Sequence, residues 1–501
     1  MLPLLTAAQI READAYTTTR EPIASVALME RAAKAFVDCF IKNFPDRKQS
    51  ISVYCGTGNN GGDGLAIARI LHQEQYKSIT VKIARFSDKT TADFNANLTR
   101  MKETKIPVSE IKSGDSLPKE NSAIIIDALL GSGLNKPLAG GYEKLVVYIN
   151  SLEKTVVAVD VPTGFFSDGE IPKEGIVLKT DLVITFQQPK INFLLPESEP
   201  FIKLWEVVNI GIDAGFIGSL NSPFQAIEEN DIRNMLKPRH RFSNKGTYGH
   251  ALIVAGQPET MGAALLSAAG CAYTGCGLTT ACVPANGLTA LNCYLPEIMA
   301  VVRKDNVLPE IRWENFSAIG IGPGLGKDKN TLSLLKYILE NYKRPIVIDA
   351  DALNLLAENK TLRDKIPVNS ILTPHMKEFD RLFSTHSSWW QRIQTGIKKA
   401  KEFQIYILLK NDYTLTFTPH GKVYFNTTSN AAMATGGMGD VLTGIITSLL
   451  AQKYSSEEAC LIGAYIHGKA GDELALSNQM NVILPGMLAA YLPATMAKLM
   501  A

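Results

Sequence analysis

The residues best suited to chemistry in this chain are aspartates that stand beside glycine-rich loops. In the C-terminal half, Asp440 ends the run Thr-Gly-Gly-Met-Gly-Asp of residues 435–440 and leads into an apolar helical stretch. Such a loop at a helix start offers several free N–H groups and the positive end of the helix dipole, which together bind an anion. An aspartate just after it can take a proton from a hydroxyl while the amides stabilise the transferred group. The alternative is a plain turn capped by Asp440, which we disfavour because so many glycines are costly unless something must come close.

A second glycine-rich run, residues 56–64, stands between an apolar strand and a helix in the N-terminal half. It contains the pattern G-x-G-x-x-G, and its glycines would let the backbone approach a phosphate at the helix N-terminus. A Rossmann dehydrogenase also needs an acidic residue at the end of the second strand to hold the ribose. Residues 82–86 supply none, although Arg85 there could suit a phosphorylated ribose. An ordinary NAD-dependent dehydrogenase is therefore disfavoured.

Two further aspartates, Asp127 and Asp160, each end an apolar strand and each precede a turn. Ligands of an open parallel sheet bind outside the carboxyl ends of the strands. A single aspartate at the end of a strand is as often a helix cap as a residue that binds a ligand. Two of them facing a glycine-rich loop favour a binding site.

The C-terminal half holds a second backbone-exposing loop, Gly-Pro-Gly-Leu-Gly, at residues 322–326. Another predicted strand ends at Asp349, and its neighbours Asp351 and Asn354 add two more oxygen-bearing side chains. Carboxylate and amide oxygens suit magnesium or its water shell.

His375 and Glu378 stand three residues apart, a spacing that could mimic a pair of metal ligands. With only one histidine, we favour contacts to an organic ligand over a metal. Lys410 ends a further strand, and a lysine at that position suits nucleotide phosphates.

Two parallel sheets are needed to position these residues. Continuous apolar strands that alternate with helices are typical of a mostly parallel sheet covered on both faces, so we predict two doubly wound α/β domains. A chain of 501 residues is also too long for one ordinary core. A stretch rich in Gly, Asn, Pro and charge places the boundary near residues 215–230. The predicted strands are residues 52–55, 79–83, 123–126, 156–159, 182–186, 251–254, 278–283, 317–321, 345–348, 370–373 and 406–410, and the predicted helices include 23–40, 65–73, 262–272, 441–451 and 457–474.

The composition, 46% hydrophobic and 20% charged with a net charge of +2, argues against a surface for nucleic acids. A local basic cluster within residues 237–245 fits a solvated linker as well as an anion site. Seven scattered cysteines without a C-x-x-C pair indicate a reducing compartment, and with no secretory start we expect a cytoplasmic protein. Residues 260–296 carry no charge, but their glycines and prolines predict a small-residue helix packed on a sheet instead of a membrane span.

The N-terminal half resembles the NAD(P)HX epimerase family in four motifs: N-N-G-G-D-G at residues 59–64, D-A-L-L-G-S-G at 127–133, V-D-V-P-T-G at 159–164 and T-F-Q-Q-P-K at 185–190. That family interconverts the R and S epimers of hydrated NADH and NADPH (NADHX and NADPHX). The resemblance implies a Rossmann-like three-layer α/β/α domain over residues 1–220, with Asp160 as the acid and base of epimerisation.

The resemblance also implies the ligand contacts of this half. A potassium ion would be held by oxygens of Asn60, Asp127 and Thr163. Thr163 stands where serine is commoner, and Phe165 and Phe166 replace a smaller pair, which we expect to reshape the pocket. The implied substrate contacts are Asn59, Asn60, Gly61, Gly62, Asp63, Gly131, Ser132, Gly133, Leu134, Asn135, Lys136, Pro137 and Asp160.

The C-terminal motifs together resemble the ribokinase-like fold. More closely, K-G-T-Y-G-H at residues 245–250, G-P-G-L-G, D-A-D-A-L-N at 349–354, T-P-H-M-K-E-F at 373–379 and A-T-G-G-M-G-D-V-L-T-G at 434–444 resemble the ADP-dependent NAD(P)HX dehydratase family. That family removes water from the S epimer while ADP is cleaved to AMP and phosphate. Phosphorylation turns the hydroxyl into a good leaving group, which the ring nitrogen then expels.

This second resemblance implies a dehydratase domain over residues 221–501 that uses Mg²⁺ with ADP and has Asp440 as its catalytic residue. Met438 replaces a serine or threonine of many members, which loses one phosphate hydrogen bond but keeps the backbone amides. The hydrated cofactor would contact Gly324, His375, Met376, Lys377, Glu378, Phe379, Asp380, Arg381 and Asp440. The adenine nucleotide would contact Lys410, Asn411, Asp412, Tyr413, Thr414, Asn430, Ala431, Ala432, Met433, Ala434, Thr435, Gly436, Gly437, Met438 and Gly439.

The sequence therefore predicts a fused epimerase and dehydratase, because hydration gives both epimers while the dehydratase accepts one. The alternative is a ribokinase-type kinase of a small molecule such as a vitamin alcohol, with an N-terminal module that binds nucleotide without catalysis. We expect NADHX or NADPHX and ADP as ligands, no nucleic-acid or membrane partner, and a homo-oligomer.

Overall fold

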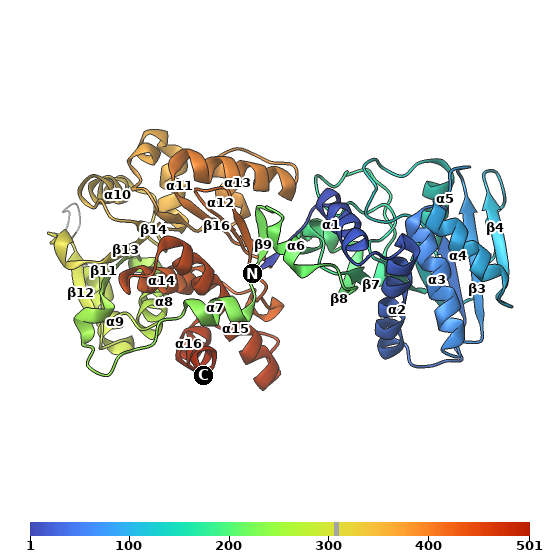
Figure 1. The fold of residues 1–501 in the computed structure, drawn as a ribbon. Coiled ribbons are helices and arrows are strands. Elements are labelled where there is room, and N and C mark those ends of the chain that lie inside the picture. The colour runs from blue at the N-terminus through green and yellow to red at the C-terminus, as the bar shows by residue number, and fades with distance from the viewer. Residues whose placement is uncertain (305–309) are drawn as a thin grey trace. The chain divides into compact units, whose positions relative to one another are not determined.

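The computed structural model describes residues 1–304 and 310–501, apart from the side chains of residues 477 and 478 (Figure 1). The chain forms two compact units. The N-terminal unit comprises Pro3–Ser222 with Ser388–Trp390, and the C-terminal unit comprises Met1–Leu2, Pro223–Ser387 and Gln391–Ala501.

The N-terminal unit is built on a parallel sheet with the strand order β4-β3-β2-β5-β6-β7-β8, counted within the described residues. The order reverses between β2 and β5, which is the topological switch point where open α/β sheets bind ligands. The strands are β2 (Ile51–Cys55), β3 (Ile79–Arg85), β4 (Val108–Lys112), β5 (Ile124–Ala128), β6 (Thr155–Val159), β7 (Thr180–Phe186) and β8 (Ile202–Val208).

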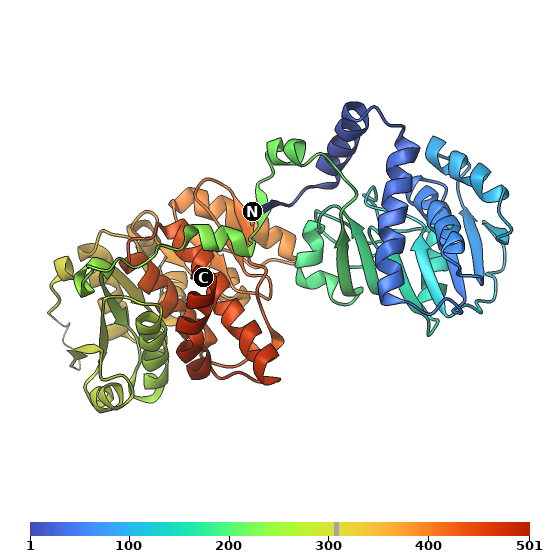
Figure 2. The same ribbon diagram turned by 60° about the horizontal axis from the view of Figure 1, so that its bottom comes forward.

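The central strands of this sheet are buried on both faces: their successive side chains point to opposite sides, and helices cover each side. Val53 of β2 packs in the cluster that also holds residues of α2 (Ser25–Asn43), α3 (Asn59–Gln73) and α4 (Ala92–Lys102), whereas Tyr54 packs against α5 (Gly140–Asn150). Figure 2 shows the long α2 and its neighbours along one side of the strands. A smaller cluster joins α1 (Ala7–Arg20) to α6 (Ala214–Ser219), where Tyr16 and Phe216 stack with ring centroids 4.0 Å apart.

Within the described residues, the sheet of the C-terminal unit has the order β1-β9-β18-β17-β16-β15-β14-β13-β10-β11-β12. Strands from β12 through β16 pair in parallel, and β16, β17 and β18 form an antiparallel meander. The strands are β1 (Leu2–Pro3), β9 (Phe224–Ala226), β10 (His250–Val254), β11 (Leu278–Pro284), β12 (Met299–Arg303), β13 (Ala318–Ile321), β14 (Ile346–Ile348), β15 (Ile371–Leu372), β16 (Tyr406–Leu409), β17 (Leu415–Phe417) and β18 (Val423–Phe425).

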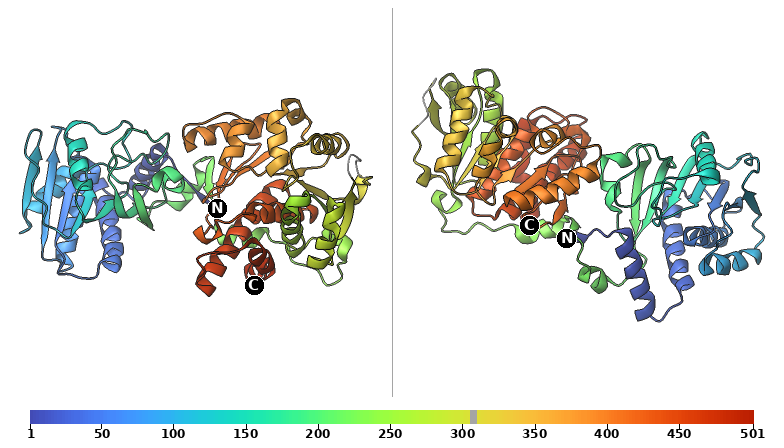
Figure 3. Two further views of the ribbon diagram at one scale, coloured as in Figure 1. Left: turned by 180° about the vertical axis from the view of Figure 1, so that it is seen from behind. Right: turned by 90° about the horizontal axis from the view of Figure 1, so that it is seen from above.

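Helices cover both faces of the second sheet (Figures 1 and 3). One layer packs in a single apolar cluster and comprises α8 (Met261–Tyr273), α14 (Met438–Ala451), α15 (Ser456–Asn478) and α16 (Pro485–Met500), with α7 (Glu229–Met235) and α9 (Leu288–Tyr294) at its border. The other layer comprises α10 (Lys329–Asn341), α11 (Ala350–Glu358), α12 (Met376–Leu382) and α13 (Trp389–Phe403). The predicted architecture of two doubly wound α/β domains is confirmed.

The charge-free stretch of residues 260–296 forms α8, the following strand β11 and α9. Helix α8 approaches α14 very closely through two glycines: a methyl on Gly270 would lie 2.4 Å from the Val441 carbonyl oxygen, and one on Gly444 would lie 2.0 Å from that of Ser267. The predicted small-residue helix against a sheet is therefore confirmed. Among the described residues, no helix combines the length and the hydrophobicity needed to cross a bilayer.

Candidate active sites

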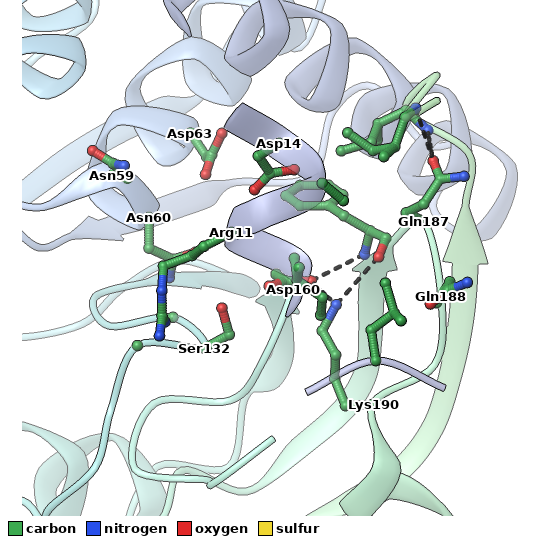
Figure 4. Close-up of a pocket in the computed structure, with 18 of the residues that line it drawn as sticks. Arg11, Asp14, Asn59, Asn60, Asp63, Ser132, Asp160, Gln187, Gln188 and Lys190 are labelled. Carbon is green, nitrogen blue, oxygen red and sulfur yellow. Dashed lines mark hydrogen bonds and ion pairs between the residues drawn. The ribbon is translucent and has the colours of Figure 1, made fainter. Parts of the chain in front are cut away.

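The N-terminal unit has a cavity of about 420 Å³ at the carboxyl ends of its central strands (Figure 4). The start of α3, the loop after β5, the end of β6 and the segment after β7 all contribute to its lining, as does α1. Of the predicted substrate residues, those that line it are Asn59, Asn60, Asp63, Gly131, Ser132, Gly133 and Asp160.

Asp160 is the most firmly held side chain of this cavity. Its backbone has φ +64°, a left-handed conformation that is uncommon outside glycine and often marks a functional position. Its Oδ1 forms an ion pair with Lys190 Nζ at 2.7 Å. The same oxygen accepts hydrogen bonds from the Phe186 N–H at 3.0 Å and the Thr185 hydroxyl at 3.1 Å. The Lys190 side chain is 1% exposed, so the two charges form a buried pair. Three donors therefore converge on one oxygen of this carboxyl group and fix its orientation.

Two other acidic groups face the same cavity: Asp63 at the start of α3, which the sequence predicted, and Asp14 of α1, which it did not (Figure 4). Burial, followed by the nearby charge of Asp160, raises the pKa of Asp14 to about 6. Burial also raises the pKa of Asp63 well above its usual range, with Asp160 and Asp14 adding to the effect. The cavity therefore combines a carboxylate paired with a lysine and two acids whose pKa values are raised.

Asp127 and Thr163 form a buried pair just beneath the loop after β5. Asp127 Oδ1 accepts hydrogen bonds from the Thr163 hydroxyl at 2.7 Å and the Leu129 N–H at 3.1 Å, and its Oδ2 accepts from the Thr163 N–H at 2.8 Å. Burial raises the pKa of Asp127 to about 6, and the Thr163 bonds act against that rise. The Asn60 Nδ2 atom is buried without a hydrogen-bond partner among the described residues. Carboxylate, hydroxyl and amide oxygens are the donors that hard cations prefer, so this set fits such an ion.

Most glycines of residues 56–64 allow close packing of the backbone and do not serve the approach of a ligand. A methyl on Gly56 would lie 1.9 Å from the Leu129 carbonyl oxygen, and one on Gly61 would lie 1.9 Å from that of Gly56. Only Gly58 of the five glycines in this run lines the cavity, and a methyl there would meet nothing within 4 Å.

The aromatic pair at residues 165–166 does not reshape the cavity, contrary to our expectation. Phe165 is buried in a separate apolar cluster with Phe193, and neither aromatic lines the cavity. Residues 134–137 are likewise outside its lining, so their predicted substrate contacts are not formed by this cavity as it stands.

In the C-terminal unit, Asp440 lies in the first turn of α14, after Gly437 with φ +99°. Lys410, at the end of β16, forms an ion pair between its Nζ and Asp349 Oδ1 at 2.8 Å, and the Thr443 hydroxyl donates to Asp349 Oδ2 at 2.7 Å. A methyl on Gly439 would lie 3.2 Å from Lys410 Nζ, so the lysine reaches the glycine-rich loop itself. These residues from β14, β16 and α14 form one charged cluster.

Burial, together with the charge of Asp349, raises the pKa of Asp440 to about 7, while Lys410 acts against the rise. Burial acts to lower the pKa of Lys410, but the charges of Asp349 and Glu378 raise it above its usual value. An acid with a pKa near neutrality can both accept and release a proton at physiological pH.

A cavity of about 390 Å³ opens beside this cluster, and it brings together the two segments predicted to hold an adenine nucleotide. The predicted residues that line it are Lys410, Asn411, Asp412, Thr414, Asn430, Ala431, Met433, Ala434, Met438 and Gly439. The sequence prediction missed Asn426, Thr428 and His467, which also line it. His467 lies 3.1 Å through Nε2 from the Met438 carbonyl oxygen, and burial lowers its pKa to about 4, so the neutral ring donates this hydrogen bond.

His375 and Glu378 form a capping box at the start of α12. The His375 Nδ1 accepts from the backbone of Lys377 and Glu378, and the Glu378 carboxylate accepts from the His375 N–H at 2.9 Å. Their spacing is thus explained by helix capping. Within the same predicted segment, Phe379 is fully buried and packs on Phe383.

The oxygens proposed for magnesium are each engaged within the protein. Asp349 holds Lys410, Asp351 accepts from the Gly326 N–H at 2.8 Å, and Asn354 accepts from Arg381 at 2.8 Å. Over the described residues, no group of three or more His, Cys, Asp or Glu side chains is arranged to hold a metal ion. Magnesium at this site would therefore depend mainly on oxygens that a nucleotide brings.

Two family models match the sequence, one described as NAD(P)H-hydrate dehydratase over residues 251–494 and one as YjeF-related protein N-terminus over residues 25–192. The bifunctional NAD(P)H-hydrate repair enzyme Nnr of Moorella thermoacetica is 32% identical over 98% of this chain and 96% of its own length. The enzyme of the same name from Coxiella burnetii is 34% identical over 93% of this chain and 94% of its own. Among solved structures, an ADP/ATP-dependent NAD(P)H-hydrate dehydratase from Bacillus subtilis, co-crystallised with ATP and Mg²⁺, is 28% identical and covers 55% of this chain and 98% of its own, with a TM-score of 0.48.

Proposed function

The chain belongs to the family of bifunctional NAD(P)H-hydrate repair enzymes, and from that premise we propose how its two halves divide the work. It is an enzyme with NAD(P)H-hydrate epimerase and NAD(P)H-hydrate dehydratase activities. We assign epimerisation to residues 1–220 and dehydration to residues 221–501. The observation that supports this division is that each unit has its own cavity beside a glycine-rich loop and an aspartate.

For epimerisation, we assign to Asp160 the transfer of the proton of the substrate hydroxyl. Its Oδ1 is occupied by Lys190, Phe186 and Thr185, while the described residues give its Oδ2 no partner. A carboxylate fixed through one oxygen presents the other in a constant direction, which is what a proton-transfer group requires. Asn59, Asn60, Asp63 and the loop of residues 131–133 would hold the rest of the hydrated nucleotide.

We further propose that a potassium ion belongs to the epimerase site, held by Asn60, Asp127 and Thr163. The oxygen-rich pair of Asp127 and Thr163 beneath the cavity supports this assignment. When bound, the ion would supply positive charge that neutralises the buried Asp127 and steadies the loop after β5.

For dehydration, we propose that Asp440 accepts the proton of the substrate hydroxyl as that oxygen takes up the phosphoryl group of ADP. The raised pKa of Asp440 and its place in the first turn of α14 support this role. Lys410 and the amides of the glycine-rich loop would stabilise the phosphoryl group, and the cavity of residues 410–414 and 426–439 would hold the adenosine. Mg²⁺ would accompany ADP, and Gly324 with residues 375–381 and Asp440 would hold the hydrated nicotinamide nucleotide.

One experiment tests both halves of this proposal. Purified protein is given ADP, Mg²⁺, K⁺ and a mixture of R and S NADPHX, and the recovered NADPH is followed by absorbance. We expect complete recovery with stoichiometric AMP and phosphate. Recovery that stops when the S epimer is exhausted would refute the epimerase assignment. A stable phosphorylated product without NADPH would instead support a small-molecule kinase.

A further inference from the structure

Helix α1 brings an acidic group into the epimerase cavity that the proposed function does not yet use. Asp14 lines this cavity and also an adjoining one that continues toward Ser25 and Asp93. Figure 4 shows its carboxyl group near that of Asp63, with Asp160 and Lys190 elsewhere in the same cavity. Asp14 makes no hydrogen bond or ion pair with any described residue, so nothing in the protein occupies its oxygens.

Asp14 and Asp160 have opposite surroundings. Asp160 Oδ1 pairs with a buried lysine and accepts hydrogen bonds from a backbone N–H and a hydroxyl. Asp14 has no such donors, and burial and the charge of Asp160 both favour its protonated form. When two carboxyl groups of one cavity have surroundings that differ in this way, one is suited to accept a proton and the other to donate one.

Epimerisation that proceeds by breaking the bond between the hydrated carbon and the ring nitrogen needs both a proton acceptor and a proton donor. The alternative is to expel the hydroxyl itself, but the dehydratase reaction consumes ADP because that hydroxyl is a poor leaving group. A free hydroxide is a poor leaving group, whereas a ring nitrogen that is protonated as it leaves is a better one, so the carbon–nitrogen bond is the one we expect to open.

We propose that Asp14 is the second proton-transfer residue of epimerisation, donating a proton to the ring nitrogen while Asp160 accepts the proton of the substrate hydroxyl. This inference rests on the proposed epimerase function of the N-terminal unit. It assigns to α1 a role in catalysis beyond its packing against α6.

The proposed step balances in both directions. Asp160 takes the hydroxyl proton, the carbon–oxygen bond becomes a carbonyl, and the electron pair of the carbon–nitrogen bond moves to nitrogen, which takes the proton of Asp14. The product is an open-chain aldehyde. Rotation about the single bond to its carbonyl carbon then presents the opposite face of the carbonyl group to the nitrogen. Asp14 then removes the nitrogen proton, nitrogen attacks the other face of the carbonyl, and Asp160 returns its proton to oxygen. Both aspartates end as they began.

The test compares Asp14→Asn with Glu12→Gln in the full-length chain, using purified R-NADPHX and following the S epimer by chromatography. Glu12 is exposed on the same helix and does not line the cavity, which makes it a matched control. We expect Asp14→Asn to lower kcat on the order of 100-fold with little change in KM, because it removes a proton donor but keeps the shape of the side chain. Asp14→Glu should restore most of the loss, and Glu12→Gln should match the wild type.

Each control separates a failure of this inference from a failure of the proposed function. All variants should dehydrate S-NADPHX at the wild-type rate, since that reaction belongs to the other unit. If the wild type does not epimerise, the proposed function fails. If the wild type epimerises and Asp14→Asn keeps its kcat, or changes only KM, the role of Asp14 is refuted.

The route has its own readout. Epimerisation in water enriched in ¹⁸O should yield S-NADPHX that keeps its original oxygen, because the carbon–oxygen bond never breaks. Entry of one solvent oxygen per turnover would overturn the opening of the carbon–nitrogen bond.

Discussion

The two cavities use the same parts, an aspartate, a lysine and a glycine-rich loop, but connect them differently. In the N-terminal unit, Lys190 pairs directly with Asp160, and the neighbouring acid Asp14 is left with a raised pKa. In the C-terminal unit, Lys410 pairs with Asp349, and Asp440 has a pKa raised to about 7. In both cavities burial raises the pKa of the acid that the lysine does not pair with directly, which leaves that acid able to exchange a proton near neutral pH.

The largest effect should come from removing the proton acceptor of the C-terminal unit. We expect Asp440→Asn to lower the rate of S-NADPHX dehydration by about 10³-fold, since an amide cannot accept the hydroxyl proton. Recovery of NADPH from the pure S epimer measures this rate. Epimerisation of R-NADPHX by the same variant is the control, and its loss would mean that the two sites are not separate.

The next effect concerns the buried pair that fixes Asp160. Replacing Lys190 with methionine leaves a buried carboxylate without its cation, which we expect to cost about 3 kcal/mol of unfolding free energy in addition to most of the epimerase activity. Urea denaturation of the N-terminal unit measures the stability. Lys203→Met is the matched control, because Lys203 pairs with Asp181 on the same sheet but is 75% exposed. An equal loss in both variants would contradict the importance of burial.

The pH profiles of the two reactions should slope in opposite directions. Asp440 must be ionised to accept a proton, so kcat/KM for dehydration should rise about tenfold between pH 6 and 8, as expected for a base with a pKa near 7. Asp14 must be protonated to donate one, and the other charged or titratable groups that line its cavity are Arg11, Asp63, Asp160 and Lys190. Its pKa of about 6 predicts a fall of about tenfold in kcat/KM for epimerisation between pH 5 and 7. If the pH profiles of the two reactions sloped in the same direction, the assignment of Asp440 as a proton acceptor and Asp14 as a proton donor would be contradicted.

The smallest effects should come from the two open glycines of the loops. A methyl would meet nothing within 4 Å at either Gly58 or Gly436, so alanine at each should change the unfolding free energy by about 0.5 kcal/mol or less. Gly58→Ala should raise KM for epimerisation about threefold, and Gly436→Ala should do so only for dehydration. Gly56→Ala, whose methyl would meet the Leu129 carbonyl, is the contrasting variant that we expect to unfold the N-terminal unit.

Much of the fold could be predicted because the central strands are continuous, mostly apolar runs buried on both faces, such as β5 and β10. The edge strand β4 was missed because four of its five residues are exposed and its sequence, Val-Ser-Glu-Ile-Lys, carries no apolar run. The three-residue strands β17 and β18 were missed because they are too short to show a period.

The loops and strand-end acids of both sites could be predicted because the topology of a parallel sheet gathers the carboxyl ends of its strands. The places of Asp14 and His467 in the sites could not be predicted. Each belongs to no motif and lies on a helix that is distant in sequence from the rest of its site. Lys190 lies within a motif that carried the resemblance, but its pairing with Asp160 depends on the turn after β7. The acids of residues 349–354 suggested a metal set, and only the folded chain reveals that each already has a local partner.

The close approach of α8 and α14 through Gly270 and Gly444 has a consequence for motion. Helices whose backbones touch cannot slide past each other without collision, so the segment that carries Asp440 behaves as part of a rigid frame. A ligand arriving at the dehydratase site therefore meets Asp440 at a fixed position, and any adjustment to that ligand has to come from segments outside the contact between α8 and α14.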